Sequence, residues 1–565
     1  MGIGMPVAFR PSKIPSLRAL LRKPVIPALR SLTITCRGNP STENDLYKYT
    51  NGRFLINEEY QYQQRYKKFD ISQLCAVAAD IGNSRSPIVS IDKKEGGFCK
   101  ALLMKKVDGS ELIAKIPSKR AGPARYSTES EVATLKYVHH HTKIPVPKVL
   151  AWDSDPSNNV GSEYILMEKA PGIQGYKVWP DMKGADNIDL VQDLVNLEKQ
   201  LASISFPMFG SLFLRKTIGD DYSRYQPLSQ DIDPTQSYCI GPSVDRFWDS
   251  PLRNQCMQFN KGPWSSLADY GISLANREMS KITLDREKDS RTYRSRRSAD
   301  EEISDLSLAM EVIKALEPHS KLASMSQPML WHTDLHLGNI HVSEADPSRI
   351  VSIIDWQSIS VGPLFLQATW PEFLKPDDEY VYGPIVPKLP DNFEQLDPDE
   401  QKLAIAAKDD ANFSKFYELS YGRCNSPIYR SLHLPTVLQE IFIRCGEAGD
   451  EETIGLYGCL VELYQAWDAL RLTPAHDCPV KFTKQEIARS EHEYKEYLNW
   501  HNVQLLARTY LDTDVDGWIS PDWDFTEVQQ RNKSVLERFI KDMSAHAYIP
   551  QEEARKMWPF LESVD

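Results

Sequence analysis

The sequence has 565 residues, of which 41% are hydrophobic, 25% charged and 10% aromatic, an ordinary balance for a globular protein. Its aromatic residues can fill a sizeable core, which excludes disorder throughout, and the lack of an apolar run of about 18 residues predicts no transmembrane segment. The net charge of −12 disfavours a nucleic-acid surface, so no nucleic-acid partner is expected.

The first 42 residues differ in charge from the remaining chain. They contain seven basic residues and no acidic one, and Ile14, Leu17, Leu20 and Leu21 share one helical face. An arginine-rich, acid-free, amphipathic segment is typical of a mitochondrial transit peptide. We therefore expect residues 1–42 to be a transit peptide that engages the mitochondrial import machinery. The alternative is a disordered basic tail.

A kinase-like N-lobe is predicted over residues 43–170. A helical lead-in occupies 45–80, and strands are expected at 88–91, 101–107, 112–116, 149–152 and 164–167 because apolar residues alternate there between turn signals. One helix is expected from Thr128 to His140, ended by Pro145 and Pro147. The fold class is therefore α+β, with a five-stranded antiparallel N-lobe sheet and one main helix.

A larger, mostly helical C-lobe is expected over residues 171–565. A highly charged stretch near 285–302 predicts an exposed insertion. The segment from Asp512 to Ile519 resembles the start of an EF-hand loop, but its twelfth position is Trp523 instead of a bidentate glutamate. A solvated acidic connection between two helices is the better interpretation of that segment.

The strongest motif lies between Trp331 and Gln357. The string from His332 to Asn339 contains His-x-Asp-x-x-x-x-Asn, and Asp355 follows Asp334 after 21 residues. This pattern meets the needs of phosphoryl transfer, in which a carboxylate receives a hydroxyl proton and Mg²⁺ neutralises phosphate charge. Asp334 is the predicted catalytic residue, and Asn339 and Asp355 are the predicted Mg²⁺ ligands. Each residue taken alone is also compatible with a turn or a helix cap.

Several N-lobe residues are candidates for ATP binding. Lys115, on the third strand, suits the lysine that holds the phosphates, and Glu131 on the following helix is its expected ion-pair partner. Glu129 is the runner-up, and Glu131 would instead close a capping box if the helix begins after Thr128. Gly96 and Gly97 would form the turn over the phosphates. Met167, Glu168 and Ala170 occupy the position of a hinge that contacts adenine.

Together these residues resemble the aminoglycoside phosphotransferase and choline-kinase-like family, from about Ile88 to Leu366. The resemblance implies a bilobal, protein-kinase-like fold that binds ATP and Mg²⁺ between its lobes. It also implies a phosphotransferase with an alcohol group as acceptor. A protein-kinase substrate groove is disfavoured because no Ala-Pro-Glu segment follows Asp355.

Three further strings are similar to a narrower fungal group, the mitochondrial phosphotransferase-like proteins named for altered inheritance of mitochondria. They begin at Asp45, Tyr238 and Gly262. The group implies a mitochondrial location and a link to organelle maintenance, but no acceptor.

Two functions remain open at this stage. The first is an ATP- and Mg²⁺-dependent kinase of a small molecule that carries a hydroxyl, either a cationic amino alcohol or a hydroxy acid. The second is a nucleotide-binding pseudokinase that acts as a scaffold or sensor, because fold and activity are separable.

Overall fold

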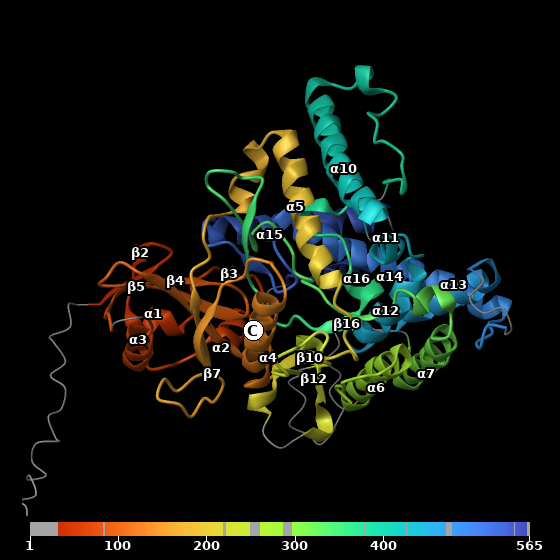
Figure 1. Cartoon of the computed structure of the whole chain (residues 1–565). Coiled ribbons are helices and arrows are strands. Elements are labelled where there is room, and N and C mark those ends of the chain that lie inside the picture. The colour runs from red at the N-terminus through yellow and green to blue at the C-terminus, as the bar shows by residue number, and fades with distance from the viewer. Residues whose placement is uncertain are drawn as a thin grey trace, which may run out of the picture.

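The computed structural model describes residues 32–82, 85–218, 222–248, 260–285, 297–377, 379–424, 426–451, 453–470, 477–546 and 549–561. Figure 1 shows two parts: a sheet-containing N-lobe, coloured red to orange, and a larger lobe built mainly of helices. The chain is a mixed α+β structure, as the sequence predicts. Residues 1–31 of the expected transit peptide and residues 286–296 of the charged insertion lie outside the described residues.

The N-lobe sheet has seven strands instead of the five expected. All five predicted strands are present as β4 (Ile88–Glu95), β5 (Cys99–Lys106), β6 (Glu111–Pro117), β7 (Val149–Asp153) and β8 (Tyr164–Glu168). They are antiparallel in the order β4-β5-β6-β8-β7. The strands β1 (Thr33–Cys36) and β2 (Asn39–Pro40) extend the β4 edge, and β1 runs parallel to β4. Both added strands lie within the segment expected to be a transit peptide.

Alternation along the strands explains how the sheet is covered. Leu102, Met104, Leu112 and Ala114 are buried on one face, because successive side chains point to opposite sides of a strand. They pack in one core with residues of the lead-in, which folds as α1 (Glu43–Tyr47), β3 (Arg53–Phe54), α2 (Glu58–Arg65) and α3 (Ile71–Ala79). The predicted main helix is α4 (Tyr126–His141), which contacts β7 and β8.

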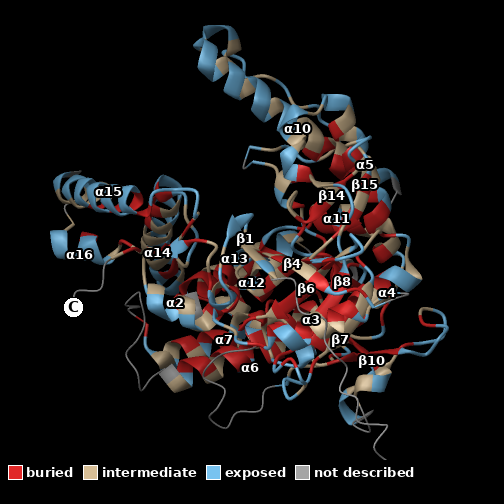
Figure 2. Cartoon of the chain, turned by 90° about the vertical axis from the view of Figure 1, so that its left-hand side faces the viewer, coloured by how far each residue is buried: buried red, intermediate tan, exposed pale blue. Residues whose placement is uncertain are grey.

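The C-lobe begins with a strand, β9 (Ile173–Gln174), that pairs with the hairpin of β14 (Ile340–Val342) and β15 (Ile350–Ile353). The main C-lobe helices are α5 (Gly184–Ala202), α6 (Leu267–Asp285), α7 (Ala299–Leu316), α10 (Pro398–Cys424), α11 (Ser426–Leu432), α12 (Val437–Glu451) and α13 (Ile454–Leu470). Two short helices, α8 (Ser320–Ala323) and α9 (Leu364–Gln367), lie between them. Figure 2 shows that α10 projects from the body, with its outer part exposed.

The C-lobe also contains strands that the sequence analysis does not predict. β10 (Ser211–Leu214), β11 (Gln226–Pro227) and β12 (Tyr238–Gly241) form one small sheet, and β13 (Pro328–Leu330) pairs with β16 (Val361–Pro363). The described part of the charged stretch is not an exposed loop. Arg297 is buried against Asp305 and Glu493, and residues 299–302 begin α7.

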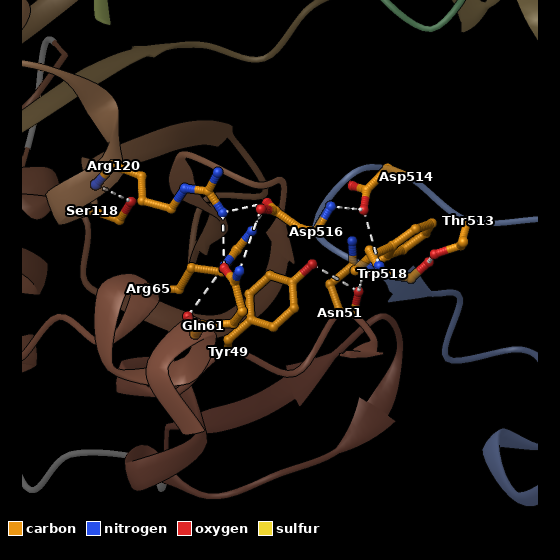
Figure 3. Close-up of polar contacts among 10 residues, drawn as sticks. All are labelled: Tyr49, Asn51, Gln61, Arg65, Ser118, Arg120, Thr513, Asp514, Asp516 and Trp518. Carbon is orange, nitrogen blue, oxygen red and sulfur yellow. Dashed lines mark hydrogen bonds and ion pairs between the residues drawn. The ribbon is translucent and has the colours of Figure 1, made fainter. Parts of the chain in front are cut away.

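The C-terminal part folds back onto the N-lobe. It contains α14 (Lys484–Leu511), β17 (Trp518–Ile519), α15 (Phe525–His546) and α16 (Gln551–Lys556), and β17 pairs with β3 of the lead-in. Figure 3 shows the loop before β17 against the N-lobe, where Asp516 meets Arg65 and Arg120. The loop connects α14 to α15, and Asp512 and Asp514 are exposed as a solvated acidic connection predicts, whereas Asp516 differs because it is partly buried and pairs with Arg65 and Arg120.

The described helices carry no candidate membrane span, since none of them combines sufficient length with sufficient apolar character.

Candidate active site

Lys115 lies at the centre of a three-residue contact that joins the two lobes. Its Nζ is 2.7 Å from Glu131 Oε1 and 2.7 Å from Asp355 Oδ1. Strand β6 supplies the lysine, α4 supplies the glutamate, and the segment after β15 supplies the aspartate. Burial alone would lower the pKa of Lys115, but the two adjoining carboxylates outweigh it and raise that pKa above its usual value. The ammonium group is therefore fixed in its charged form between two carboxylates.

The structure distinguishes between the alternatives for the lysine's partner. Glu129 turns away and accepts hydrogen bonds from Arg125 and Ser154. Helix α4 begins at Tyr126, so Thr128 is not its N-cap, and the Thr128 hydroxyl donates to Glu163 instead. The capping-box interpretation of Glu131 is therefore wrong, and the expected ion pair with Lys115 is present.

The catalytic loop and the segment that carries Asp355 are tied together. The buried imidazole of His332 lies 3.0 Å from the Ile354 carbonyl oxygen and packs edge-on against Trp356. The Ile354 amide donates to the Asn339 carbonyl. Asn339 Nδ2 donates to the Asp334 carbonyl at 2.9 Å, which fixes the loop around Asp334. Asp334 itself is exposed to solvent and reachable by an acceptor.

Asp355 has an unusual backbone and a retained charge. Its φ of 62° lies in the left-handed region, which few residues other than glycine adopt but which aspartate tolerates. Burial would raise the pKa of its carboxyl, but the Lys115 ammonium outweighs that effect and lowers the pKa below its usual value. Such backbone conformations cluster at functional sites, where surrounding contacts hold them.

The turn with Gly96 and Gly97 joins β4 to β5, and the residue before it is firmly anchored. The side chain of Glu95 is 2% exposed and forms ion pairs with Lys93 and Lys100. Its carboxylate also accepts hydrogen bonds from the backbone amide and the hydroxyl of Thr50 in the lead-in. A Cβ atom built on either glycine would meet no atom within 4 Å. Both glycines therefore face open space, and the buried Glu95 holds the start of the turn in place. A close approach of phosphates to this backbone would require both features.

The predicted hinge residues connect β8 to the C-lobe. Met167 is buried, whereas the Glu168 amide donates to the Lys148 carbonyl at 3.0 Å. Among the described residues, the Ala170 amide has no backbone acceptor, so it is available to a ligand. Gly172, with φ of +72°, then brings the chain against β14, because a Cβ there would lie 2.1 Å from the Val342 carbonyl oxygen.

The donor set around Asp355 suits Mg²⁺. Asn339 uses Nδ2 on Asp334, which leaves its Oδ1 as an acceptor, and Asp355 uses Oδ1 on Lys115, which leaves its Oδ2. Mg²⁺ prefers hard oxygen ligands and takes only one or two from the protein when phosphates and waters supply the others. Among the described residues, no group of three or more His, Cys, Asp or Glu side chains is placed to hold a metal ion.

A cavity of about 310 Å³ lies beside Asp334. The sequence analysis does not predict the residues that line it away from the loop with Asp334. Trp331, Trp370, Glu372 and Lys375 line it together with Glu198 from α5. Tyr417 and Tyr421 of α10 both donate to Glu198 Oε2, and burial raises the pKa of Glu198 to about 7. No sequence signal marks these residues, because their proximity depends on how α5, α10 and the loop after α9 pack.

Comparison with known families identifies the part of the chain that carries these residues. Residues 102–366 match the family described as the phosphotransferase enzyme family. This segment is a phosphotransferase-family domain. It includes Lys115, Glu131, Asp334, Asn339 and Asp355, and it ends within α9. The strands β1 to β4 and the helices after α9 lie outside the matched segment of the phosphotransferase domain.

Curated relatives extend the similarity beyond the phosphotransferase domain. A subtelomeric hrmA-associated cluster protein of Aspergillus fumigatus is 28% identical over 507 residues, which cover 83% of this chain and 96% of the relative. Proteins named altered inheritance of mitochondria protein 9, mitochondrial, are 24% identical in Komagataella phaffii and 21% identical in Candida albicans. The first covers 70% of this chain and 67% of the relative, and the second covers 85% and 84%.

Solved structures with a similar arrangement include the streptomycin–ATP–APH(2'')-IIa ternary complex, with a TM-score of 0.36 and 13% identity. It matches 69% of this chain and 95% of the solved chain. A thermostable variant of aminoglycoside phosphotransferase APH(4)-Ia, in complex with AMP-PNP and hygromycin B, has a TM-score of 0.32 and 12% identity, and matches 73% of this chain and 94% of its own.

Proposed function

We propose that the chain transfers the γ-phosphate of ATP to a hydroxyl group of a small molecule, with Mg²⁺ bound at Asn339 and Asp355. The observation that carries the proposal is the joining of Lys115 and Asp355 beside a cavity that opens on Asp334. A cation for the phosphates, ligands for a metal and a carboxylate facing an acceptor cavity are the parts that phosphoryl transfer requires.

In the proposed reaction, Asp334 accepts the proton of the acceptor hydroxyl as the hydroxyl oxygen attacks the γ-phosphorus. The bond between the γ-phosphorus and the β–γ bridging oxygen breaks, and ADP leaves with that electron pair. Lys115 holds the phosphates, and Glu131 keeps the lysine oriented. When bound at Asn339 and Asp355, Mg²⁺ supplies charge neutralisation of the phosphates. The backbone at Glu168 and Ala170 would contact adenine.

The cavity beside Asp334 favours a cationic acceptor, such as an amino alcohol, over a hydroxy acid. Its lining contains three carboxylates, from Glu198, Asp334 and Glu372, and one ammonium group, from Lys375. Trp331 and Trp370 add aromatic faces, and cations bind favourably over such faces. Because burial raises the pKa of Glu198 to about 7, the charge that is complementary to an ammonium group comes mainly from the carboxylates of Asp334 and Glu372.

The experiment is ATP consumption by the full chain across a panel of amino alcohols, aminoglycosides, sugars and hydroxy acids. We expect consumption that depends on an acceptor and on Mg²⁺, and a loss of roughly 10²–10⁴-fold in Asp334→Ala. A matched control is Asp346→Ala, because Asp346 is an exposed aspartate in the turn between β14 and β15. Consumption that is unaffected by Asp334→Ala would contradict the proposal.

The second candidate function is a pseudokinase scaffold that binds nucleotide without turnover. It is favoured by the three-residue contact itself, because Lys115 donates to Asp355 and so occupies one oxygen of the predicted Mg²⁺ ligand. Binding of Mg²⁺ and ATP without consumption on any acceptor would support this second function and exclude the first.

We further propose that the protein acts in mitochondria and that its presequence ends before Thr33. The names of the relatives support this location and a link to mitochondrial maintenance. Because β1 pairs with β4, cleavage of the chain after Cys36 would remove β1 from the N-lobe sheet. The test is import of a fluorescent protein fused to residues 1–31, followed by N-terminal sequencing of the mature full chain. A cytosolic fusion, or a mature terminus after Cys36, would contradict this proposal.

A further inference from the structure

A second cavity, of about 370 Å³, lies between the N-lobe and the C-terminal loop. Phe98, Lys119, Arg120, Arg246 and Asp516 line it, together with neutral residues of α2. We call it the basic cavity. Five separate parts of the chain meet there: α2, the turn after β4, the loop between β6 and α4, the segment after β12, and the loop before β17.

The cations of the basic cavity outnumber its carboxylates. Lys119, Arg120 and Arg246 supply three positive charges, and Asp516 supplies the one negative charge among the lining residues. Figure 3 shows that Asp516 is already shared: it pairs with Arg120 and also with the buried Arg65 behind the cavity wall. The cavity therefore keeps an excess of positive charge after its internal ion pairs are formed.

Arg246 is the part of the cavity that lacks a partner. Its guanidinium stacks on the Phe98 ring, with Cζ 3.5 Å from the ring centroid. It is half-buried, and among the described residues no atom accepts a hydrogen bond from it and no carboxylate forms an ion pair with it. Asp245, Asp334 and Asp355 act on it only through space. A planar fork of five donors, stacked on an aromatic face and otherwise unused, suits a phosphate group.

The basic cavity is connected to the predicted phosphate turn and to the segment that carries Asp355. Phe98 follows Gly97 of the predicted phosphate turn. Gln357, two residues after Asp355, donates from Nε2 to the Ala121 carbonyl at 3.3 Å, so the loop with Arg120 contacts the segment that carries the predicted metal ligand. A phosphate in the basic cavity would therefore lie near the predicted phosphate turn and the segment that carries Asp355. The basic cavity shares no lining residue with the cavity beside Asp334.

We propose that the basic cavity is a phosphate-binding site in which Arg120 and Arg246 bind the anion. The phosphate can come from either of two sources: the terminal phosphate of the nucleotide, in which case this inference rests on the proposed function, or a phosphate group of a second ligand. Binding itself requires no turnover.

The test uses the full chain and inorganic phosphate, with affinity measured by isothermal titration calorimetry. We expect Arg246→Gln and Arg120→Gln each to weaken phosphate binding roughly tenfold or more, because each removes a charge-assisted hydrogen-bonding group. The matched control is Arg538→Gln, since the Arg538 side chain on α15 is 85% exposed. If a glutamine variant fails to fold, Arg246→Lys keeps the charge, loses the fork and gives a smaller loss of the same sign.

Two further titrations distinguish the sources. If the nucleotide is the source, a non-hydrolysable ATP analogue with Mg²⁺ abolishes phosphate binding, while ADP with Mg²⁺ leaves it intact. If a second ligand is the source, phosphate still binds in the presence of the ATP analogue. The proposal is overturned if the wild type binds no phosphate below about 10 mM, or if Arg246→Gln and Arg120→Gln bind it as the control does. A protein that binds phosphate but consumes no ATP would contradict only the proposed function.

Discussion

Lys115 and Asp355 stand 240 positions apart in the sequence and 2.7 Å apart in the structure, where they join the N-lobe sheet to the C-lobe hairpin. The same ammonium group also holds Glu131. A charge that is shared by two carboxylates fixes the positions of the proposed site residues of both lobes at once. It also makes the stability of the contact between the lobes depend on the side chain that is proposed to hold the phosphates.

The first prediction concerns that shared charge. Lys115→Met leaves Glu131 and Asp355 without their cation, and an uncompensated buried carboxylate costs about 3–5 kcal/mol of unfolding free energy. Urea unfolding measures the loss. The double variant Lys115→Met with Glu131→Gln should regain part of the stability, because the buried glutamate is then neutral, yet ATP consumption should stay abolished. Lys105→Met, an exposed lysine on the neighbouring strand, is the control. A single variant as stable as this control would contradict the prediction.

The second prediction concerns Glu198. Burial raises the pKa of this carboxyl to about 7 in the folded protein, against an ordinary value of 4.5. Between these two pH values the folded state keeps a proton that the unfolded state has lost, so the free energy of unfolding falls as pH rises. Glu198→Gln should remove this slope and should be more stable than the wild type at pH 8, by up to about 3 kcal/mol. Urea unfolding at pH 5 and pH 8 measures the difference, with Glu372→Gln as the control from the same cavity. A slope that persists in Glu198→Gln would refute the prediction.

The sequence predicts the site residues that lie close together along the chain, and it does not predict those that only the packing of distant elements brings together. The string from His332 to Asn339 and its distance to Asp355 are readable because one hairpin carries them, and the order of Lys115 before Glu131 follows from a strand that precedes a helix. Glu198 and Arg246 are not predictable, since their roles exist only once distant elements form cavities.

The errors in the fold have the same origin. The strand β1 is missed because a four-residue strand gives a weak signal inside a segment dominated by its charge, and its parallel partner β4 is far along the chain. Arg297 is expected to be exposed because its neighbours in the sequence are charged, but Asp305 and Glu493 supply the two carboxylates that bury it. Charge density along a sequence does not reveal which single charge finds a partner.

The third prediction concerns the place where the segment after β8 crosses the β14–β15 hairpin. Gly172 and Gly161 have nearly equal φ values, +72° and +73°, so alanine is equally strained in the backbone at both. A Cβ at Gly172 would collide with the Val342 carbonyl oxygen, whereas a Cβ at Gly161 meets no atom within 4 Å. Gly172→Ala should therefore cost about 2 kcal/mol more unfolding free energy than Gly161→Ala, because β9 must move away from β14. Equal losses in the two variants, measured by urea unfolding, would show that the crossing is not tight.

The fourth prediction concerns the docking of the C-terminal loop. Asp516 accepts hydrogen bonds from Arg65, Arg120 and Gln61, so Asp516→Asn removes the charge that two arginines share. The expected loss is about 1–2 kcal/mol, less than for a fully buried pair because Asp516 is 22% exposed. Hydrogen exchange should rise in α2 and in the β17–β3 pair, since the ion pairs of Asp516 add to the backbone pairing and the apolar contacts that hold β17 against the lead-in. Asp512→Asn is the matched control: Asp512 is an exposed aspartate in the same loop, and asparagine tolerates its left-handed backbone. Faster exchange in both variants alike would mean that the loop is held by its backbone pairing, and that the ion pairs with Arg65 and Arg120 add nothing to the docking.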